Sequence, residues 1–287
     1  MKSVLRYFVL LVALISISQS VFSQSVLDRK GNVWMQWGYN RTTYGKSDIH
    51  FSGEGFDFTL HDVVALDMPE EWDPSVYLNP RKMTVPQFNF RVGFFISDRN
   101  SISFGWDHMK YKLLTNQEVR ITGTIDQDQS EEFDGVYHYD RIRLDPKFLE
   151  FEHSDGFNFV NLTIDHLQEA WVSENQRHAL NFMGAFSAGA MIPWTDTRVF
   201  NVHHRNRPHV SGYALSAQFG FRFEFFTNGF LQFRLQHGFA NLPDVLIQDH
   251  LPSRASHSVW FTERSISLGF YVPVKRNKKR PEENFRP

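Results

Sequence analysis

Residues 211–239 carry a long, regular alternation of apolar and polar side chains. From Tyr213 to Phe225 every second residue is apolar, and most of these are aromatic, while the residues between them are small or polar. The alternation resumes over residues 231–239 after a short break that contains Thr227 and Asn228. A period of two is the repeat of a β-strand, and such a break predicts a tight hairpin. Long strands with one Phe-rich face and one polar face are typical of a membrane-spanning barrel with lipid outside.

The composition agrees with a membrane-exposed β-protein and excludes several other classes. Phe accounts for 29 of the 287 residues, which is more than a small core needs. The chain has no Cys, so disulfide and thiol chemistry are excluded. A net charge of −2 gives no basic field, and no nucleic-acid partner is expected. After the N-terminal segment, no apolar run approaches the length of a transmembrane helix.

The two ends of the chain differ from the middle. Residues 1–23 begin with Lys2 and Arg6, continue with a short apolar run and end in small residues, which predicts a secretory signal peptide. An N-terminal membrane anchor is the alternative. Residues 24–274 are assigned to the barrel. Residues 275–287 are predicted as a basic, disordered periplasmic tail, with a binding role as the minority interpretation.

The same alternation predicts the other membrane-spanning strands. Together with the hairpin they lie at residues 31–44, 87–97, 101–111, 157–167, 178–192 and 257–272. Short connections (98–100, 173–177, 226–228) alternate strictly with long ones (45–86, 112–156, 193–209, 241–256). This is the rule for barrels with short periplasmic turns and long extracellular loops. The sequence therefore predicts an all-β, closed, antiparallel up-and-down transmembrane β-barrel of eight strands. Segments 56–66 and 118–125 are expected to extend above the membrane; counting them as spanning gives ten strands, the alternative.

Charged residues of both signs fall on the inward faces of the predicted strands. They are Arg91, Asp107, Asp165, Arg222, Glu224, Arg234 and Glu263. The interior of an eight-stranded barrel is filled by side chains, and an unpaired charge there is costly. We therefore expect a paired polar network that plugs the barrel, unlike a porin. A proton or ion path through these groups, and so a narrow channel, is the alternative.

Several stretches resemble the small, eight-stranded outer-membrane β-barrel proteins of Gram-negative bacteria. They are the Trp37-Gly38-Tyr39-Asn40-Arg41 segment and the hairpin of residues 88–104, and the resemblance in pattern covers most of residues 31–273. It implies a monomer in the outer membrane, in contact with membrane lipid and lipopolysaccharide and inserted by the barrel-assembly machinery. It also implies a structural, adhesion or small-ligand-binding role without a cofactor.

Some members of this group are lipid A deacylases with a His-x-Ser pair near the outer rim and an acidic partner. His209 and Ser211 have this spacing, and both share the lipid-facing parity of Phe219. The chemistry needs a hydroxyl nucleophile, an imidazole base and a carboxylate that orients the base. No acidic partner can be identified from the sequence. A lipid A-modifying hydrolase is therefore the alternative function, and the favoured interpretation is that both are polar residues of the rim.

Three further sets of polar residues were weighed as sites. His203, His204 and His209 have loose metal-ligand spacing, but rim histidines are the favoured interpretation, and no metal is expected. Neighbours on a strand point to opposite faces, so residues 153–155 cannot form a triad, and residues 154–156 are predicted as a turn. Lys46, Arg205 and Arg207 are candidates for contact with lipopolysaccharide phosphates.

Overall fold

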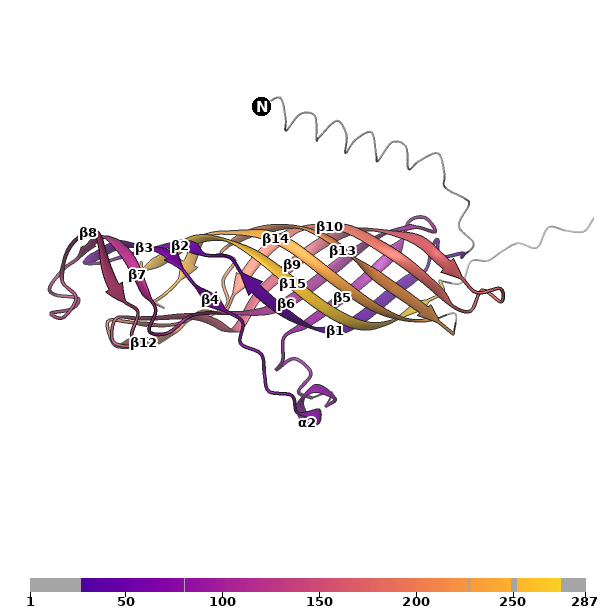
Figure 1. Ribbon diagram of the computed structural model, residues 1–287, viewed down its shortest axis with the longest axis horizontal. Coiled ribbons are helices and arrows are strands. Elements are labelled where there is room, and N and C mark those ends of the chain that lie inside the picture. The colour runs from indigo at the N-terminus through magenta and orange to yellow at the C-terminus, as the bar shows by residue number, and fades with distance from the viewer. Residues whose placement is uncertain (1–26, 80, 227, 249–251, 275–287) are drawn as a thin grey trace, which may run out of the picture.

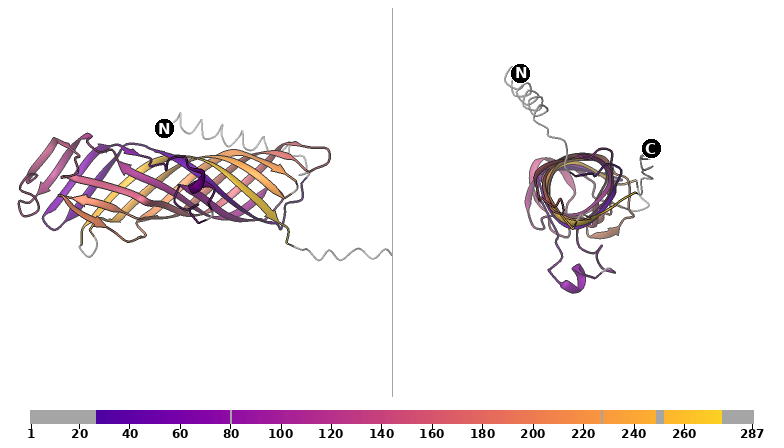
Figure 2. Two further views of the ribbon diagram at one scale, coloured as in Figure 1. Left: turned by 90° about the horizontal axis from the view of Figure 1, so that it is seen from below. Right: turned by 90° about the vertical axis from the view of Figure 1, so that its right-hand side faces the viewer.

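The first and last long strands of the chain pair with each other, from Val33 opposite Val272 to Tyr44 opposite Phe261. This pairing closes a ring (Figures 1 and 2) in a computed structural model that describes residues 27–79, 81–226, 228–248 and 252–274. Within these residues the ring contains eight antiparallel strands, which confirms eight rather than ten. In ring order they are β1 (Val33–Tyr44), β5 (Phe88–Phe95), β6 (Asn100–Leu113), β9 (Leu149–Val172), β10 (Ala179–Pro193), β13 (Gly212–Phe225), β14 (Gly229–Leu246) and β15 (Arg254–Val272).

Side chains alternate across the barrel wall as the sequence pattern predicts. On β13, Phe219 is 60% exposed on the outside, whereas Arg222 is fully buried on the inside. The same holds on β15, where Leu268 is exposed and Glu263 is buried. Such a wall hides polar groups inside and turns apolar groups outward, which is stable only when the outside is hydrocarbon. The ring is therefore built as a transmembrane barrel.

The sheet continues beyond the ring at the end that carries the long connections. We call this part the extension; in Figure 1 it lies at the left. The strand order runs from β15 to β2 (Ser47–Gly53), β3 (Phe56–Val63), β7 (Glu118–Ile125) and β8 (Gly135–Arg143). Shorter strands join the ring strands there: β4 (Ala65–Leu66) pairs with β6, and the hairpin of β11 (Asp196–Val199) and β12 (Val202–Arg205) pairs with β9. Segments 56–66 and 118–125 thus lie above the membrane part.

The extension has an apolar core, which orders further parts of the long connections as strands besides the expected segments 56–66 and 118–125. Phe51, Phe58, Phe148 and Phe151 are each at most 1% exposed and pack with their rings together. The prediction of a turn at residues 154–156 is wrong, because β9 runs through it to bury residues of the extension. Within this part of β9, Gly156 has a φ of +143°, a value that residues other than Gly rarely adopt.

Between β4 and β5 the chain leaves the barrel wall and makes a single helical turn. This turn, α2 (Pro74–Tyr77), lies in the long connection of residues 45–86. Asp73 caps it by accepting a hydrogen bond from the Ser75 backbone N–H at 2.8 Å, and Pro74 occupies the first turn, where no N–H is needed. Viewed down the barrel in Figure 2, the turn stands outside the ring.

The expected signal peptide (1–23) and basic tail (275–287) lie outside the described residues. Among the residues that are described, no helix has the length and hydropathy required to cross a bilayer.

Two histidines, His153 and His257, are buried in the core of the extension. His153 and His257 are fully enclosed, with ring centroids 6.3 Å apart, and Tyr111 packs against both. Burial lowers the pKa of His257 to about 4 and places the pKa of His153 well below its usual 6.5. The unfolded chain therefore binds more protons than the folded one as the pH falls below about 6.5. Stability is complete above that pH and declines towards pH 4.

We predict that acid opens the extension and that His257→Phe reduces this sensitivity. The pKa shift of His257 corresponds to about 3 kcal/mol of stability lost between pH 6.5 and 4. Hydrogen exchange of β2 and β3 in detergent-solubilised protein, compared at pH 7.5 and 4.5, measures the opening. His138→Phe, on the exposed strand β8, should keep the wild-type response. Equal acid sensitivity in His257→Phe and wild type would contradict the assignment.

Candidate functional site

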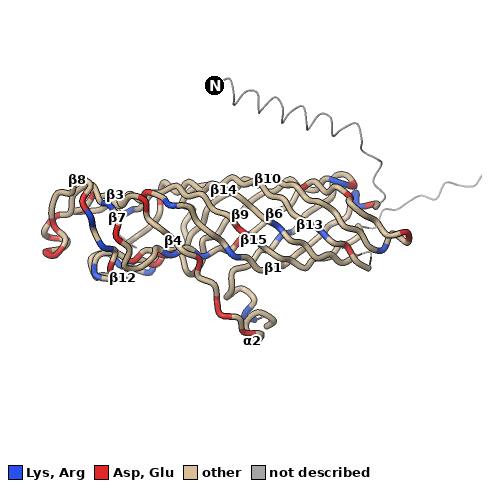
Figure 3. Tube along the Cα trace, viewed as in Figure 1, with Lys and Arg blue, Asp and Glu red and all other residues tan. Residues whose placement is uncertain are grey.

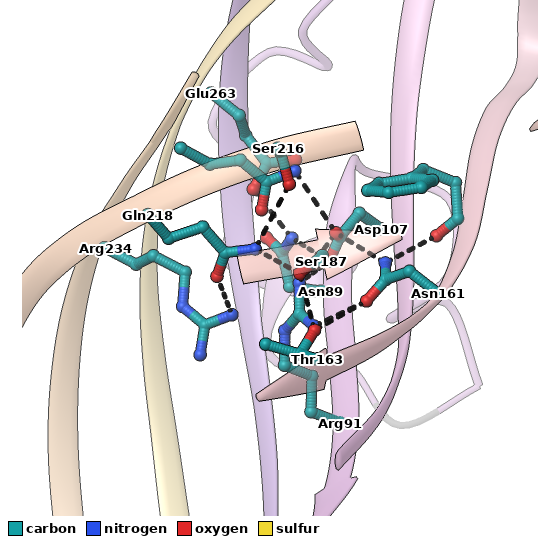
Figure 4. Close-up of polar contacts among 12 residues, drawn as sticks. Asn89, Arg91, Asp107, Asn161, Thr163, Ser187, Ser216, Gln218, Arg234 and Glu263 are labelled. Atoms are coloured by element: carbon teal, nitrogen blue, oxygen red, sulfur yellow. Dashed lines mark hydrogen bonds and ion pairs between the residues drawn. The ribbon is translucent and has the colours of Figure 1, made fainter. Parts of the chain in front are cut away.

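The centre of the barrel holds an ion pair between Arg91 on β5 and Asp107 on β6. Both side chains are fully buried, and Nη2 of Arg91 donates to the two carboxylate oxygens at 2.7 and 2.9 Å. Nη1 of Arg91 donates to Asn161 at 2.8 Å and to Thr163 at 2.7 Å (Figure 4). Gly105 makes room for this contact, because a Cβ at that position would lie 2.3 Å from Nη1. The guanidinium is thus held from several strands, which offsets the cost of its burial.

A second carboxylate, Glu263 on β15, is linked to this pair through Asn89. The Asn89 side-chain amide donates to Asp107 at 2.7 Å and to Glu263 at 2.8 Å. Asn161 donates to Asp107 at 3.1 Å. Figure 4 shows these groups converging from opposite sides of the lumen. The network therefore ties strands on both sides of the β1–β15 closure to one another.

A second ion pair joins Arg234 on β14 to Asp165 on β9 at 3.3 Å. Arg234 also donates to Gln218 at 2.6 Å, and Ser103 donates to Asp165 at 3.0 Å. Arg222 was expected to form an ion pair, but its guanidinium packs against aromatic rings. Its guanidinium carbon lies 4.9 Å from the Trp34 ring centroid and 4.3 Å from that of Phe230, and its Nε donates to Gln232.

The mouth of the barrel at the end of the short turns is closed by Arg29, which the sequence interpretation missed. Arg29 precedes β1 and is only 3% exposed. Its guanidinium reaches Glu224 at 2.9 Å, Glu169 at 3.1 Å and Asn181 at 2.9 Å. Glu224 also accepts a hydrogen bond from the Tyr271 hydroxyl at 2.7 Å. Arg29 lies outside every alternating segment, so no pattern in the sequence marks it as an interior residue.

All seven charged residues expected inside the barrel are buried there. Glu224 lies with Arg29 at the mouth and Arg222 lies against Trp34 and Phe230, while the other five belong to the central polar network. The buried side chains of the lumen fall into three successive layers. The layer next to the Arg29 cluster is mainly aromatic and apolar and includes Trp34, Phe95, Phe230 and Tyr271. The middle layer is the polar network. The third is the apolar core of the extension. Buried side chains thus lie at both ends and at the centre of the described part of the barrel.

The structure supplies His209 with an acidic partner but does not join it to Ser211. Nε2 of His209 lies 2.9 Å from Oδ2 of Asp244, and the other carboxylate oxygen, Oδ1, accepts a hydrogen bond from Nε of Arg254 at 2.8 Å. The hydrogen bond to His209 lowers the pKa of the Asp244 carboxyl. The Ser211 hydroxyl, 1% exposed, donates at 3.4 Å to the backbone carbonyl of His209. The hydroxyl is thus directed at the main chain, whereas a nucleophile needs it against the imidazole.

The remaining candidates are dispersed. His203 contacts Asp196 at 2.7 Å, and His204 faces Gln248 at 3.4 Å. Across the described ranges, no group of three or more His, Cys, Asp or Glu side chains has metal-binding geometry. Arg205 is paired with Asp155 at 2.6 Å. The side chains that the sequence suggests as candidate metal or phosphate ligands are therefore held in separate local contacts.

We predict that breaking the central ion pair destabilises the barrel more than removing both charges. Arg91→Met leaves the Asp107 carboxylate buried and unpaired, so we expect a loss of about 3–5 kcal/mol. The double variant Arg91→Met/Asp107→Leu should lose less, because no buried charge remains. Urea unfolding in lipid vesicles measures both, with Lys147→Met on the surface as the control. A double variant less stable than Arg91→Met would contradict this account.

Comparison with protein-family profiles and with curated sequences finds no match for this chain. Among solved structures it is similar to the outer membrane protein OprG from Pseudomonas aeruginosa, with 8% identity and a TM-score of 0.38 over 86% of this chain and 98% of that one. It is also similar to Ail, the attachment invasion locus protein of Yersinia pestis (8%, 0.26, 83% and 99%). The N-terminal β-barrel domain of Pseudomonas aeruginosa OprF is a third (7%, 0.28, 84% and 98%). These likenesses are weak, and no residue role is carried from them to this chain.

Proposed function

We propose that this protein is a non-conducting outer-membrane barrel that holds a rigid binding or adhesion surface outside the cell. The exposed apolar wall supports the membrane placement, since Phe186, Phe219, Leu162 and Leu268 are each at least 60% exposed. Barrels of this kind have short periplasmic turns and long extracellular loops. The end that carries the long connections and the extension is therefore assigned to the outside of the cell. The observation that carries the proposal is the folded extension, whose core continues beyond the membrane part.

The filled lumen argues for a role outside the barrel rather than through it. Arg91 and Asp107 fill its centre, and Arg29 fills the periplasmic mouth. Beyond them, Tyr111 and Phe157 pack together in the outer part, with ring centroids 5.5 Å apart and ring planes tilted by 33°. An ion crossing this path would have to displace buried pairs and an apolar core, both of which are costly.

The extension presents a fixed surface with an open strand edge. β8 ends the strand order and pairs with β7 alone among the described strands. Val136 is 64% exposed and Tyr139 is 49% exposed on this strand, and Arg120 lies over the Tyr139 ring at 5.4 Å. A surface held by a packed core loses little conformational entropy on binding. Exposed aromatic and apolar groups on such an edge are suited to contact with another protein or surface.

We predict that the purified protein shows no conductance steps in planar bilayers, because its lumen is packed along its length. Heat-modifiable gel mobility of the same preparation shows that the barrel is folded. A general porin in the same bilayers is the positive control. Regular unitary steps from folded protein would replace the proposal with a narrow channel.

We predict that display of the protein increases the attachment of cells to one another and to glass, and that the β8 surface is needed for this. The variant Val136→Ser/Tyr139→Ser should return attachment close to the level of cells without the protein, since it removes the exposed apolar groups. Val202→Ser, on the exposed strand β12, is the matched control and should attach like wild type. Settling and glass-retention assays at equal surface expression measure the effect. Full attachment by the β8 variant would rule out this surface.

A further inference from the structure

Two arginines lie side by side on the outward wall of the barrel. Arg41 on β1 is directly paired in register with Arg264 on β15. The next outward residues towards the periplasm, Tyr39 and Ile266, are also paired with each other. Like charges opposite one another weaken a ladder, and a cation on the lipid face of a barrel is costly. A bound anion would offset both the repulsion between the two arginines and the cost of placing them on this wall.

The Arg41 guanidinium is held in place, whereas that of Arg264 has no protein partner among the described contacts. Arg41 donates to its neighbouring Asn40 carbonyl at 2.7 Å and to the Tyr77 hydroxyl at 3.0 Å. Asp67 attracts Arg41 electrostatically, but its oxygens accept hydrogen bonds from the Thr42 backbone at 3.2 Å and from Gln87 at 2.5 Å. The Arg264 guanidinium, and those Arg41 N–H groups that are not bonded to Asn40 or Tyr77, are therefore available to bind an anion.

Directly below the arginine pair, an apolar groove of about 800 Å³ runs down the outside of the barrel. Its walls include Trp37 and Tyr39 from β1 and Ile266 and Leu268 from β15. The segment around α2 covers it with Tyr77, whose ring packs edge-on to Tyr39 at 5.0 Å and whose carbonyl accepts a hydrogen bond from the Tyr39 hydroxyl. In Figure 2, α2 lies outside the ring. The groove is lined by outward residues such as Tyr39 and Ile266, so it opens to the outside of the barrel and not to the lumen.

We propose that this groove binds one lipid A molecule, with a phosphate on Arg41 and Arg264 and an acyl chain along Tyr39, Ile266 and Leu268. Guanidinium groups bind phosphate through paired, charge-assisted hydrogen bonds, and the Tyr77 hydroxyl orients one of them. The arginines lie at the end of the groove nearer the long connections, which is the outer leaflet. The assignment to lipid A rests on the outer-membrane placement proposed above.

A second groove on the wall provides an internal comparison. It has a volume of about 900 Å³ and is lined by Ile102, Phe186, Leu215 and Trp260 among others. Neither groove has Lys or Arg in its own lining, but the first ends next to the paired Arg41 and Arg264. An acyl chain held by apolar contact alone would occupy both grooves equally. Selective binding at the first groove would therefore depend on the arginine pair.

The test measures lipid binding to the purified full-length protein in detergent by native mass spectrometry. The probes are bisphosphorylated lipid A, dephosphorylated lipid A and phosphatidylglycerol. We expect one bisphosphorylated lipid A per protein, and binding at least about tenfold weaker for the dephosphorylated form. Arg41→Gln/Arg264→Gln should weaken binding by a similar factor, while Arg141→Gln, an exposed arginine on β8, should not.

Substitutions in the two grooves separate chain binding from charge. Ile266→Trp should obstruct the first groove and weaken lipid A binding with both arginines intact, whereas Leu215→Trp in the second should leave it unchanged; both residues are 54% exposed. If the double arginine variant does not fold by gel mobility, Arg264→Gln alone decides, because that side chain has no described contact to lose. Equal binding of dephosphorylated lipid A, equal or tighter binding of phosphatidylglycerol, or wild-type binding by the arginine variant would overturn the proposal. None of these outcomes depends on adhesion or conductance.

Discussion

The hydrogen-bonded seam between β1 and β15 is the constraint on which the rest of the structure depends. In hydrocarbon no water is present to satisfy backbone N–H and C=O groups, so an open sheet edge would leave a row of them unpaired. The seam runs along all of β1, and it removes the edge from the membrane part. Once the ring is closed, the alternating side chains of each strand can face only the lipid or the lumen. Apolar residues face the lipid, and the charged residues must find partners within the lumen.

The interior changes from charged and polar at the centre of the membrane part to apolar in the extension. This change divides the molecule into these two parts. Inside the membrane part the ring pairs Arg91 with Asp107 and Arg234 with Asp165. Beyond the membrane the same strands enclose phenylalanines, because the outside there is water and the apolar face must turn inward. β9 spans both environments without a break, with Asp165 in one and Phe151 in the other. Figure 3 shows the corresponding change outside, where charged residues gather on the extension and at the turns of the opposite end.

With the lumen filled, the surfaces left for function are on the outside. The extension offers an exposed edge at β8, held by a core that fixes its shape. The wall offers the groove beneath Arg41 and Arg264, which the segment around α2 covers. One surface faces the medium and the other faces lipid, and the Tyr77 contacts to Tyr39 and Arg41 join the wall to the long connection above it. A lipid bound there would also stabilise that connection.

The sequence by itself determined which residues face inward or outward, because a strand repeats every two residues whatever its neighbours are. From that period and the alternation of short and long connections followed the eight strands, the apolar wall and the inward position of residues such as Arg222 and Glu263. Tertiary structure alone decided the partners. Arg29 meets Glu224, His209 meets Asp244 and Arg41 meets Arg264 only because ring closure and register bring distant segments together. It also decided that the apparent loops are strands, since the apolar core that orders them is assembled from several connections at once and is visible in none of them singly.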